Sequence, residues 1–168
     1  MTDAGAIGSV MPFPAPNALA VANVRLHANA ERLVSAVNTL DRLLVPAIAA
    51  DYLDALYGLT RLWRDEFLGS SVYDPFCAES ADGRVVEGLT YLRGQGIHRA
   101  VVLSKLGGVA DYYYDHYNCW TWIADAPLTG MKVSGSYQQH FADREVRITM
   151  DSAERFCMAL PQAGREVA

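Results

Sequence analysis

The sequence has few cysteines and no long hydrophobic run. Its 168 residues contain only three cysteines, Cys77, Cys119 and Cys157, with no CxxC pair. An odd number of scattered cysteines cannot form a complete disulfide framework, which favours a reducing compartment. No stretch approaches the ~20 apolar residues of a membrane-spanning helix, and residues 1–16 lack the Lys or Arg of a signal peptide. We therefore expect a cytoplasmic protein that does not enter a membrane.

Common catalytic fingerprints are also missing. The sequence has no GxxxxGK[ST], GxSxG or HExxH motif and no dinucleotide-binding glycine pattern. These absences remove the usual support for nucleotide hydrolases, serine hydrolases and metalloproteases, so we expect no cofactor and no bound nucleotide. His116 and Cys119 form one compact pair of zinc-ligand types, whereas a structural zinc site generally has two such pairs. We therefore predict no metal site.

Composition predicts a folded chain with a single domain. Hydrophobic residues make up 51% of the sequence, and the net charge of −5 argues against broad adhesion to nucleic acid or anionic lipid. Pro12, Pro14 and Pro16 favour an extended segment over a helix. We expect a flexible proline-rich arm over residues 1–16, a single helical domain over 17–161 and a tail over 162–168.

Helical periodicity dominates residues 17–67. Apolar residues at helical spacing predict one long amphipathic helix from Asn17 to near Val45. Pro46 suits the first turn of a second helix, whose apolar positions run from Ile48 to Phe67. Together these two segments predict a long, antiparallel helical hairpin.

Turn residues interrupt the pattern after this hairpin. Asp74-Pro75 and Asp82-Gly83 predict a loop over residues 69–83, and a third helix then runs from near Asp82 to Gly94. The apolar run within 97–106 fits either a buried helix or a buried strand. Its helical neighbours favour the helix.

The C-terminal third is predicted to contain a small β element. Residues 120–123 (WTWI) predict a short strand or hairpin, and residues 145–150 alternate apolar and polar side chains as a strand does. Asp151 and Glu154 resemble a capping box that opens a final helix ending before Pro161. The predicted fold is mainly α: a helical bundle with a long N-terminal helical hairpin and a small β element in the C-terminal third.

A local cluster of positive charge stands out against the acidic chain. Residues 84–105 carry a single acid, Glu87, and four cations: Arg84, Arg93, Arg99 and Lys105. This segment therefore has a charge of 4 − 1 = +3, which predicts a local site for an anion.

Arg93 and His98 supply the chemistry that such a site needs for RNA cleavage. Cleavage through the 2′-hydroxyl requires a base of near-neutral pKa and a permanent cation that holds the phosphate. We predict His98 as the proton acceptor and Arg93 as the phosphate clamp, with Arg84, Arg99 and Lys105 binding the RNA. The alternative is that both side chains cap the end of a helix by charge–dipole attraction.

The Arg93–His98 motif (R-x4-H), following two long helices, resembles the HEPN superfamily. Many members of that superfamily are α-helical, metal-independent RNases that act as toxins or defence effectors, with the motif facing its mate across a dimer. The segments YLRGQGIHRAVVL, WTWIADAPL and YQQHFADREVRITMDSAERF also resemble uncharacterised actinobacterial and actinophage proteins. The resemblance implies an endoribonuclease in defence or phage–host biology, active or catalytically degenerate. Only Arg93 and His98 carry over, and Gly94 stands where HEPN nucleases usually have a polar residue.

Aromatic residues concentrate between Val109 and Ile123. Their π faces suit the stacking of unpaired bases, but the acids Asp111, Asp115 and Asp125 repel phosphate. A core or a subunit interface is the better interpretation, with these candidate interface residues: Tyr113, Tyr117, Trp120 and Trp122. Two functions stay open: a metal-independent RNase-type effector, or a non-catalytic helical protein–protein interaction module that works as a homodimer.

Overall fold

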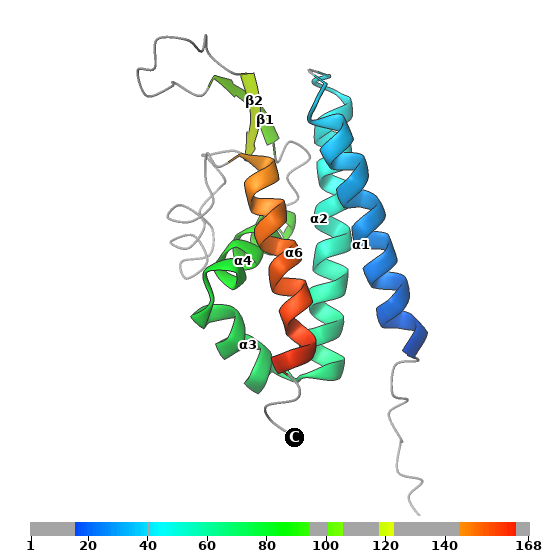
Figure 1. The fold of residues 1–168 in the computed structure, drawn as a ribbon, viewed down its shortest axis with the longest axis vertical. Coiled ribbons are helices and arrows are strands. Elements are labelled where there is room, and N and C mark those ends of the chain that lie inside the picture. Colours follow the sequence, from blue (N-terminus) through cyan, green and yellow to red (C-terminus); the bar gives the residue numbers. More distant parts are fainter. Residues whose placement is uncertain (1–15, 40, 95–100, 106–117, 123–144, 164–168) are drawn as a thin grey trace, which may run out of the picture.

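The protein folds as a bundle of helices with a two-stranded hairpin at one end (Figure 1). The computed structural model describes residues 16–39, 41–94, 101–105, 118–122 and 145–163. The elements in chain order are α1 (Pro16–Ala36), α2 (Leu44–Leu62), the π-helix η1 (Trp63–Phe67), α3 (Ser70–Glu79), α4 (Ala81–Gly94), β1 (Val101–Lys105), β2 (Asn118–Trp122) and α6 (Val146–Ala163). The predicted mainly α fold, with its long N-terminal helical hairpin, is confirmed.

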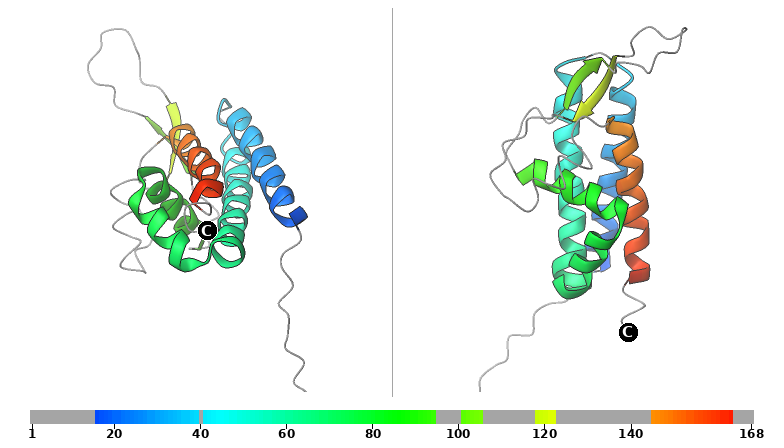
Figure 2. Two further views of the ribbon diagram at one scale, coloured as in Figure 1. Left: turned by 60° about the horizontal axis from the view of Figure 1, so that its bottom comes forward. Right: turned by 90° about the vertical axis from the view of Figure 1, so that its left-hand side faces the viewer.

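The helices surround α2, which is the most central element. α1 lies antiparallel to α2 at one edge of the bundle, α6 runs alongside α2 toward the viewer of Figure 1, and α3 and α4 lie on the side away from α1 (Figures 1 and 2). Every helix contributes to the core, which includes these nearly inaccessible side chains: Leu33, Leu56, Leu59, Leu89, Leu92, Trp122, Phe156 and Leu160. Truncation of such a side chain typically costs about 2–5 kcal/mol of stability.

The strands form an antiparallel pair in which Val101 lies opposite Trp122 and Lys105 lies opposite Asn118. The predicted β element in the C-terminal third is therefore confirmed. The helix predicted over residues 97–106 is wrong for 101–105. Val101 and Val102 are β-branched and favour extended backbone, which pairing with β2 stabilises.

Polar side chains end α1 earlier than predicted, at Ala36 instead of near Val45. Thr39 Oγ1 donates a hydrogen bond to the Ala36 carbonyl at 2.7 Å. Asp41 Oδ1 accepts hydrogen bonds from the backbone N–H groups of Leu43 and Leu44, both at 2.9 Å, which lower the pKa of Asp41. These side chains satisfy backbone groups that the helix ends leave without partners. Pro46 lies in the first turn of α2, as predicted.

Residues 70–79 form the helix α3, so the loop predicted over 69–83 is wrong. Tyr73 and Phe76 are one turn apart and pack on Phe156 of α6, with ring centroids 6.0 and 5.5 Å away. This tertiary packing outweighs the helix-breaking tendency of Pro75 inside α3. The prediction that the next helix begins near Asp82 is confirmed, because α4 starts at Ala81.

The strand predicted over residues 145–150 is also wrong from Val146 onward. Only Glu145 keeps an isolated bridge, to Thr121, and α6 begins at Val146. Its buried positions follow a helical period that includes Val146, Met150 and Ala153, whereas Ile148 is exposed. Residues 151 and 154, the predicted capping box, therefore lie inside the helix, which continues past Pro161 to Ala163.

The predicted arm and tail lie outside the described residues, apart from Pro16 and residues 162–163. Among the helices that the structure describes, none combines the length and the apolar character needed to cross a membrane.

Candidate functional site

Arg93, the predicted phosphate clamp, is held by α2. Its Nε donates to Asp54 Oδ1 at 2.8 Å, and its Cζ lies 4.4 Å from the centroid of the Tyr57 ring. Asp54 and Tyr57 are one turn apart on α2, so the guanidinium ties the last turn of α4 to the centre of the bundle. A carboxylate of the same chain thus offsets the charge that a phosphate would need.

The other residues of the predicted RNA site are not assembled by the described structure. His98 and Arg99 lie outside the described residues, as does the side chain of Lys105. Arg84 is nine residues before Arg93 on α4, which places the two about 180° apart around the helix axis. Arg84 Nε instead donates to the Ala78 carbonyl near the end of α3, at 3.1 Å. Arg84 and Arg93 therefore do not form one track for a phosphate backbone.

Trp120 and Trp122, two predicted interface residues, are buried inside the chain. They are 4% and 0% exposed, which makes them core residues. Trp120 Nε1 donates to the Thr39 carbonyl at 3.0 Å, and Trp122 Nε1 donates to Thr149 Oγ1 at 2.7 Å. The sequence left two alternatives for these residues, a core or a subunit interface, and Trp120 and Trp122 belong to the core. Tyr113 and Tyr117 lie outside the described residues.

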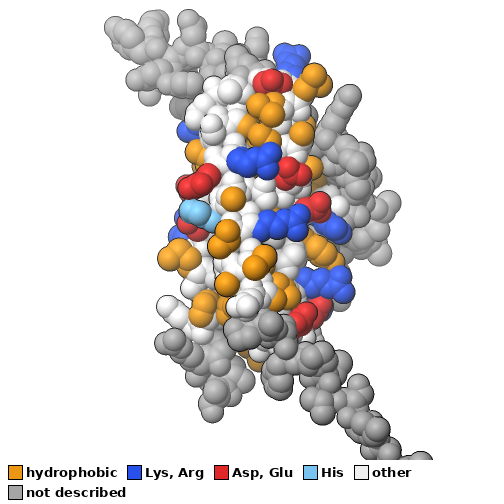
Figure 3. All heavy atoms as spheres, turned by 90° about the vertical axis from the view of Figure 1, so that its right-hand side faces the viewer, with side chains coloured by type: hydrophobic (Ala, Val, Ile, Leu, Met, Phe, Trp, Pro, Cys, Tyr) orange, Lys and Arg blue, Asp and Glu red, His pale blue; other side chains and the backbone are white. Residues whose placement is uncertain are grey.

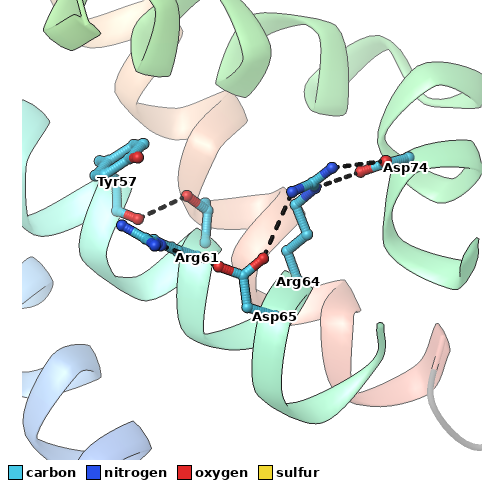
Figure 4. A network of polar contacts seen from close by, with 6 residues as sticks. Tyr57, Arg61, Arg64, Asp65 and Asp74 are labelled. Carbon is cyan, nitrogen blue, oxygen red and sulfur yellow. Dashed lines mark hydrogen bonds and ion pairs between the residues drawn. The ribbon is translucent and has the colours of Figure 1, made fainter. Parts of the chain in front are cut away.

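A polar cleft of about 780 Å³ lies beside Tyr57, between α2, η1, α3 and α4. Its arginines point at carboxylates (Figure 4). Arg64 binds Asp74 through two nitrogens, at 2.7 and 3.0 Å, and Arg61 Nε donates to Asp65 Oδ2 at 2.9 Å. The Arg64 guanidinium lowers the pKa of Asp74. An anion entering this cleft would have to displace carboxylates that already satisfy the arginines.

The π-helix η1 helps to position this ion-pair network. Its wider turn carries Arg64 and Asp65 between α2 and α3, and the Leu68 N–H reaches back to the Trp63 carbonyl at 2.8 Å. π-Helical turns often occur at functional sites. Here the turn aims Arg64 at α3, so in the described structure it fastens two helices together.

This pairing extends beyond the cleft. Of the nine arginines in the described part of the chain, five form ion pairs with acids of the same chain: Arg32, Arg61, Arg64, Arg93 and Arg155. A protein surface that binds RNA needs cations available to phosphates. The described arginines therefore give little support to an RNA-binding face.

An apolar groove of about 510 Å³ lies on the opposite side of the bundle, between α1 and α6. Leu26, Ala30 and Val34 of α1 form one wall, and α6 forms the other with these residues: Met150, Cys157, Met158 and Pro161. Tyr52 and Trp63 line its floor. α1 packs on α2, and α6 lies on an adjacent side of α2 (Figures 1 and 2). The face of the molecule on the α1 side shows hydrophobic side chains among charged ones (Figure 3). Val34 and Met158 are 43% and 71% exposed, so the groove presents hydrophobic surface to solvent.

The charged residues along the groove are mostly acidic. Glu31 lies on the α1 wall and Asp151 and Glu154 lie on the α6 wall, whereas no Lys or Arg belongs to the described residues that line the groove. His27 Nε2 lies 3.3 Å from Glu31 Oε1, with both side chains well exposed. Burial raises the pKa of Tyr52 on the floor, and Cys157, Glu154 and Asp151 raise it further. The groove therefore combines apolar walls with a negative potential.

The two described cysteine thiols are unsuited to nucleophilic chemistry. Burial is the main cause that raises the pKa of Cys77 in the polar cleft and of Cys157 in the groove, each to about 12. Both thiols are therefore protonated at neutral pH, and the thiolate is the reactive form. Within the ranges that the structure describes, no group of three or more His, Cys, Asp or Glu residues is placed to hold a metal ion.

The groove was not predicted from the sequence, although a signal for it exists. On α1, Leu26, Ala30 and Val34 recur at spacings of four residues, and Val34 is exposed. Met150 and Met158, eight residues apart, lie on one side of α6 once residues 146–150 are known to be helical.

No protein-family model, curated protein or solved structure matches this chain significantly.

Proposed function

We propose that this protein is a helical protein-binding module whose α1–α6 groove receives the apolar face of a helix from a partner protein. The observation that carries the proposal is the exposed hydrophobic lining of the groove, with Val34 and Met158 open to solvent above the Tyr52 and Trp63 floor. Contiguous exposed apolar surface rimmed by polar residues is typical of interaction sites. A helix in a groove is a recurrent mode of peptide recognition.

The dimensions and composition of the groove suit a short helix. Its α1 wall runs from Asn23 to Val34, which spans about 16 Å and corresponds to three turns of a partner helix. Met150 and Met158 have flexible thioether side chains that adapt to different apolar anchors. The groove would thus accept a partner helix with apolar residues at spacings of three and four.

The endoribonuclease in phage defence stays a prediction, as do the homodimer and the cytoplasmic location. The contacts of Arg93 favour the binding module over the nuclease, because Asp54 and Tyr57 already engage its guanidinium. The ion pairs of the described arginines point the same way.

Selection from a displayed library of amphipathic helical peptides tests the proposal. We expect selected peptides to lose about tenfold or more in affinity for Val34→Gln/Met158→Gln, because that double variant removes apolar surface from both walls of the groove. Val24→Gln/Ile148→Gln is the matched control, since it changes one exposed apolar residue on each of α1 and α6 outside the groove lining. Equal binding by wild type and the groove variant, at unchanged melting temperature, would overturn the proposal.

A further inference from the structure

The charge along the groove limits which helices it accepts. Of the charged side chains that line it, Glu31, Asp151 and Glu154 are acids, and His27 is the only basic type among the described lining residues. His27 Nε2 lies 3.3 Å from Glu31 Oε1 on the α1 wall. The carboxylates of Asp151 and Glu154 lie on the opposite wall, which α6 forms. The acids therefore border an apolar strip on both sides.

The arginines nearest in sequence to these acids bind elsewhere. Arg32 of α1 pairs with Asp51 at 3.5 Å, and Arg155 of α6 pairs with Asp82 at 2.7 Å and also donates to Ser152 Oγ. Neither arginine lines the groove. The pKa of Arg155 is raised mainly by its hydrogen bond to Asp82 and also by the charge of Asp151 one turn away, so Arg155 offsets Asp151 in part. The ion pairs among the described residues do not include Glu154.

Two groups at the floor and wall of the groove respond to the same field. Burial is the main cause that raises the pKa of Tyr52, and Cys157, Glu154 and Asp151 raise it further; Glu154 also adds to burial in raising the pKa of Cys157. These directions agree with the position of Asp151 and Glu154 beside the groove.

Building on the proposed function, we infer that the partner is a basic amphipathic helix, with Lys or Arg residues flanking its apolar anchors. Its apolar residues would cover the Leu26, Val34 and Met158 surface, and its cations would lie next to Asp151, Glu154 and Glu31. A second copy of this groove is a poorer occupant, since face-to-face docking would bring the same acids together. Opposite charges along the rim would mainly set partner choice and association rate, while the apolar strip supplies affinity.

Three labelled peptides of about 14 residues test the inference against the full chain by fluorescence anisotropy. All carry Leu anchors at helical spacing, and they differ only in having Lys, Gln or Glu at the flanking positions. We expect the Lys peptide to bind about tenfold more tightly than the Gln peptide and the Glu peptide to bind least. The preference should shrink between about 0.1 M and 1 M salt, over which the Debye length falls from ~10 Å to ~3 Å.

Two charge variants assign the preference to the groove. Asp151→Asn/Glu154→Gln should remove most of the Lys-over-Gln preference, whereas Glu66→Gln/Glu79→Gln should leave it unchanged. The control removes the same amount of charge at exposed positions outside the groove lining, so the effect of net charge cancels.

The outcomes separate this inference from the proposed function. Equal binding of the Lys and Gln peptides, with loss in Val34→Gln/Met158→Gln, overturns the basic partner and keeps the binding module. A Lys preference that both charge variants reduce equally also overturns the basic partner as a property of the groove. Binding of none of the three peptides, together with self-association that the groove variant abolishes, would make a second copy the occupant and overturn the inference.

Discussion

The polar cleft and the apolar groove lie on opposite sides of the same central helix and differ in how far their own chain satisfies them. In the cleft, Arg64 is bound by Asp74 and Arg61 by Asp65, so its charges serve to join α2, η1 and α3. In the groove, Val34 and Met158 face solvent. A cluster of charged residues can thus be structural, while an apolar wall of ordinary composition is the better candidate for binding.

Phe156 of α6 packs on Tyr73, which lines the cleft, and belongs to the core, so its removal should have the largest effect. It is buried, and it supports Tyr73 and Phe76 of α3 while its own helix forms one wall of the groove. Phe156→Ala should lower the free energy of unfolding by about 3–5 kcal/mol, measured by urea denaturation. Ile148→Ala on the same helix is the control, because this exposed side chain should change stability by less than about 1 kcal/mol. Similar losses in both variants would contradict the distinction.

A methyl group at Gly83 should disrupt the first turn of α4, where it lies against the end of α3. A Cβ at this position would lie 2.1 Å from the Cys77 carbonyl oxygen and 2.6 Å from Ser80 Oγ, which accepts the Gly83 N–H bond. Gly83→Ala should therefore cost about 1–3 kcal/mol in the same denaturation experiment. Gly58→Ala is the matched control. Gly58 lies in α2 with nothing within 4 Å of the added atom, so the variant should gain about 0.5–1 kcal/mol. A stabilised Gly83→Ala would show that the turn is not this tight.

Arg93→Ala separates the structural role of Arg93 from the predicted catalytic one. The variant loses the Asp54 ion pair and the Tyr57 cation–π contact, both partly exposed, and should lose about 1 kcal/mol of stability. We expect no RNA cleavage in EDTA by wild type, Arg93→Ala or His98→Ala. Cleavage by wild type that both variants abolish, with His98→Ala folded normally, would support the endoribonuclease prediction against the binding module.

Acid should slightly reduce the stability that the Arg64–Asp74 ion pair of the cleft contributes. The pKa of Asp74 is lowered by Arg64, so the ion pair contributes stability above the usual aspartate pKa near 4 and loses it as the pH falls through the lowered value. Because both side chains are about half exposed, the contribution should be under about 1 kcal/mol. Urea midpoints between pH 7 and pH 2 should fall less steeply for Asp74→Asn than for wild type. Parallel curves would show that the pair contributes nothing.

Local patterns predicted the parts of the fold that depend on neighbours in sequence. The spacing of apolar residues gave the helical hairpin, and Pro46 marked the start of α2. Turn residues were misleading where distant contacts prevail: Pro75 suggested a loop, but Tyr73 and Phe76 find Phe156 eighty residues further along the chain. The prediction of a helix over residues 97–106 is wrong for β1 for the same reason, because β1 pairs with a distant strand that begins at Asn118.

The candidate sites were harder to predict than the fold, because each depends on pairs of distant residues. The local charge pattern indicates Arg93 as a candidate site residue. Its partner Asp54 is 39 residues away, so no local pattern predicts their ion pair. The groove arises from the relative placement of α1 and α6, at opposite ends of the chain. Sequence spacing indicates which face of a helix is apolar, but it does not say whether that face will find a partner.

The hydrogen bonds at the end of the bundle that carries β1 and β2 limit how the groove can widen. There, Trp120 binds the Thr39 carbonyl just beyond α1, Trp122 binds Thr149 in the first turn of α6, and Arg147 binds Asn38. These hydrogen bonds hold the two walls of the groove at the same end of the bundle. A larger bound helix would therefore have to separate α1 from α6 at the opposite end, near Trp63 and Pro161. At the end that the hydrogen bonds hold, the distance between the walls limits the size of the partner's apolar side chain.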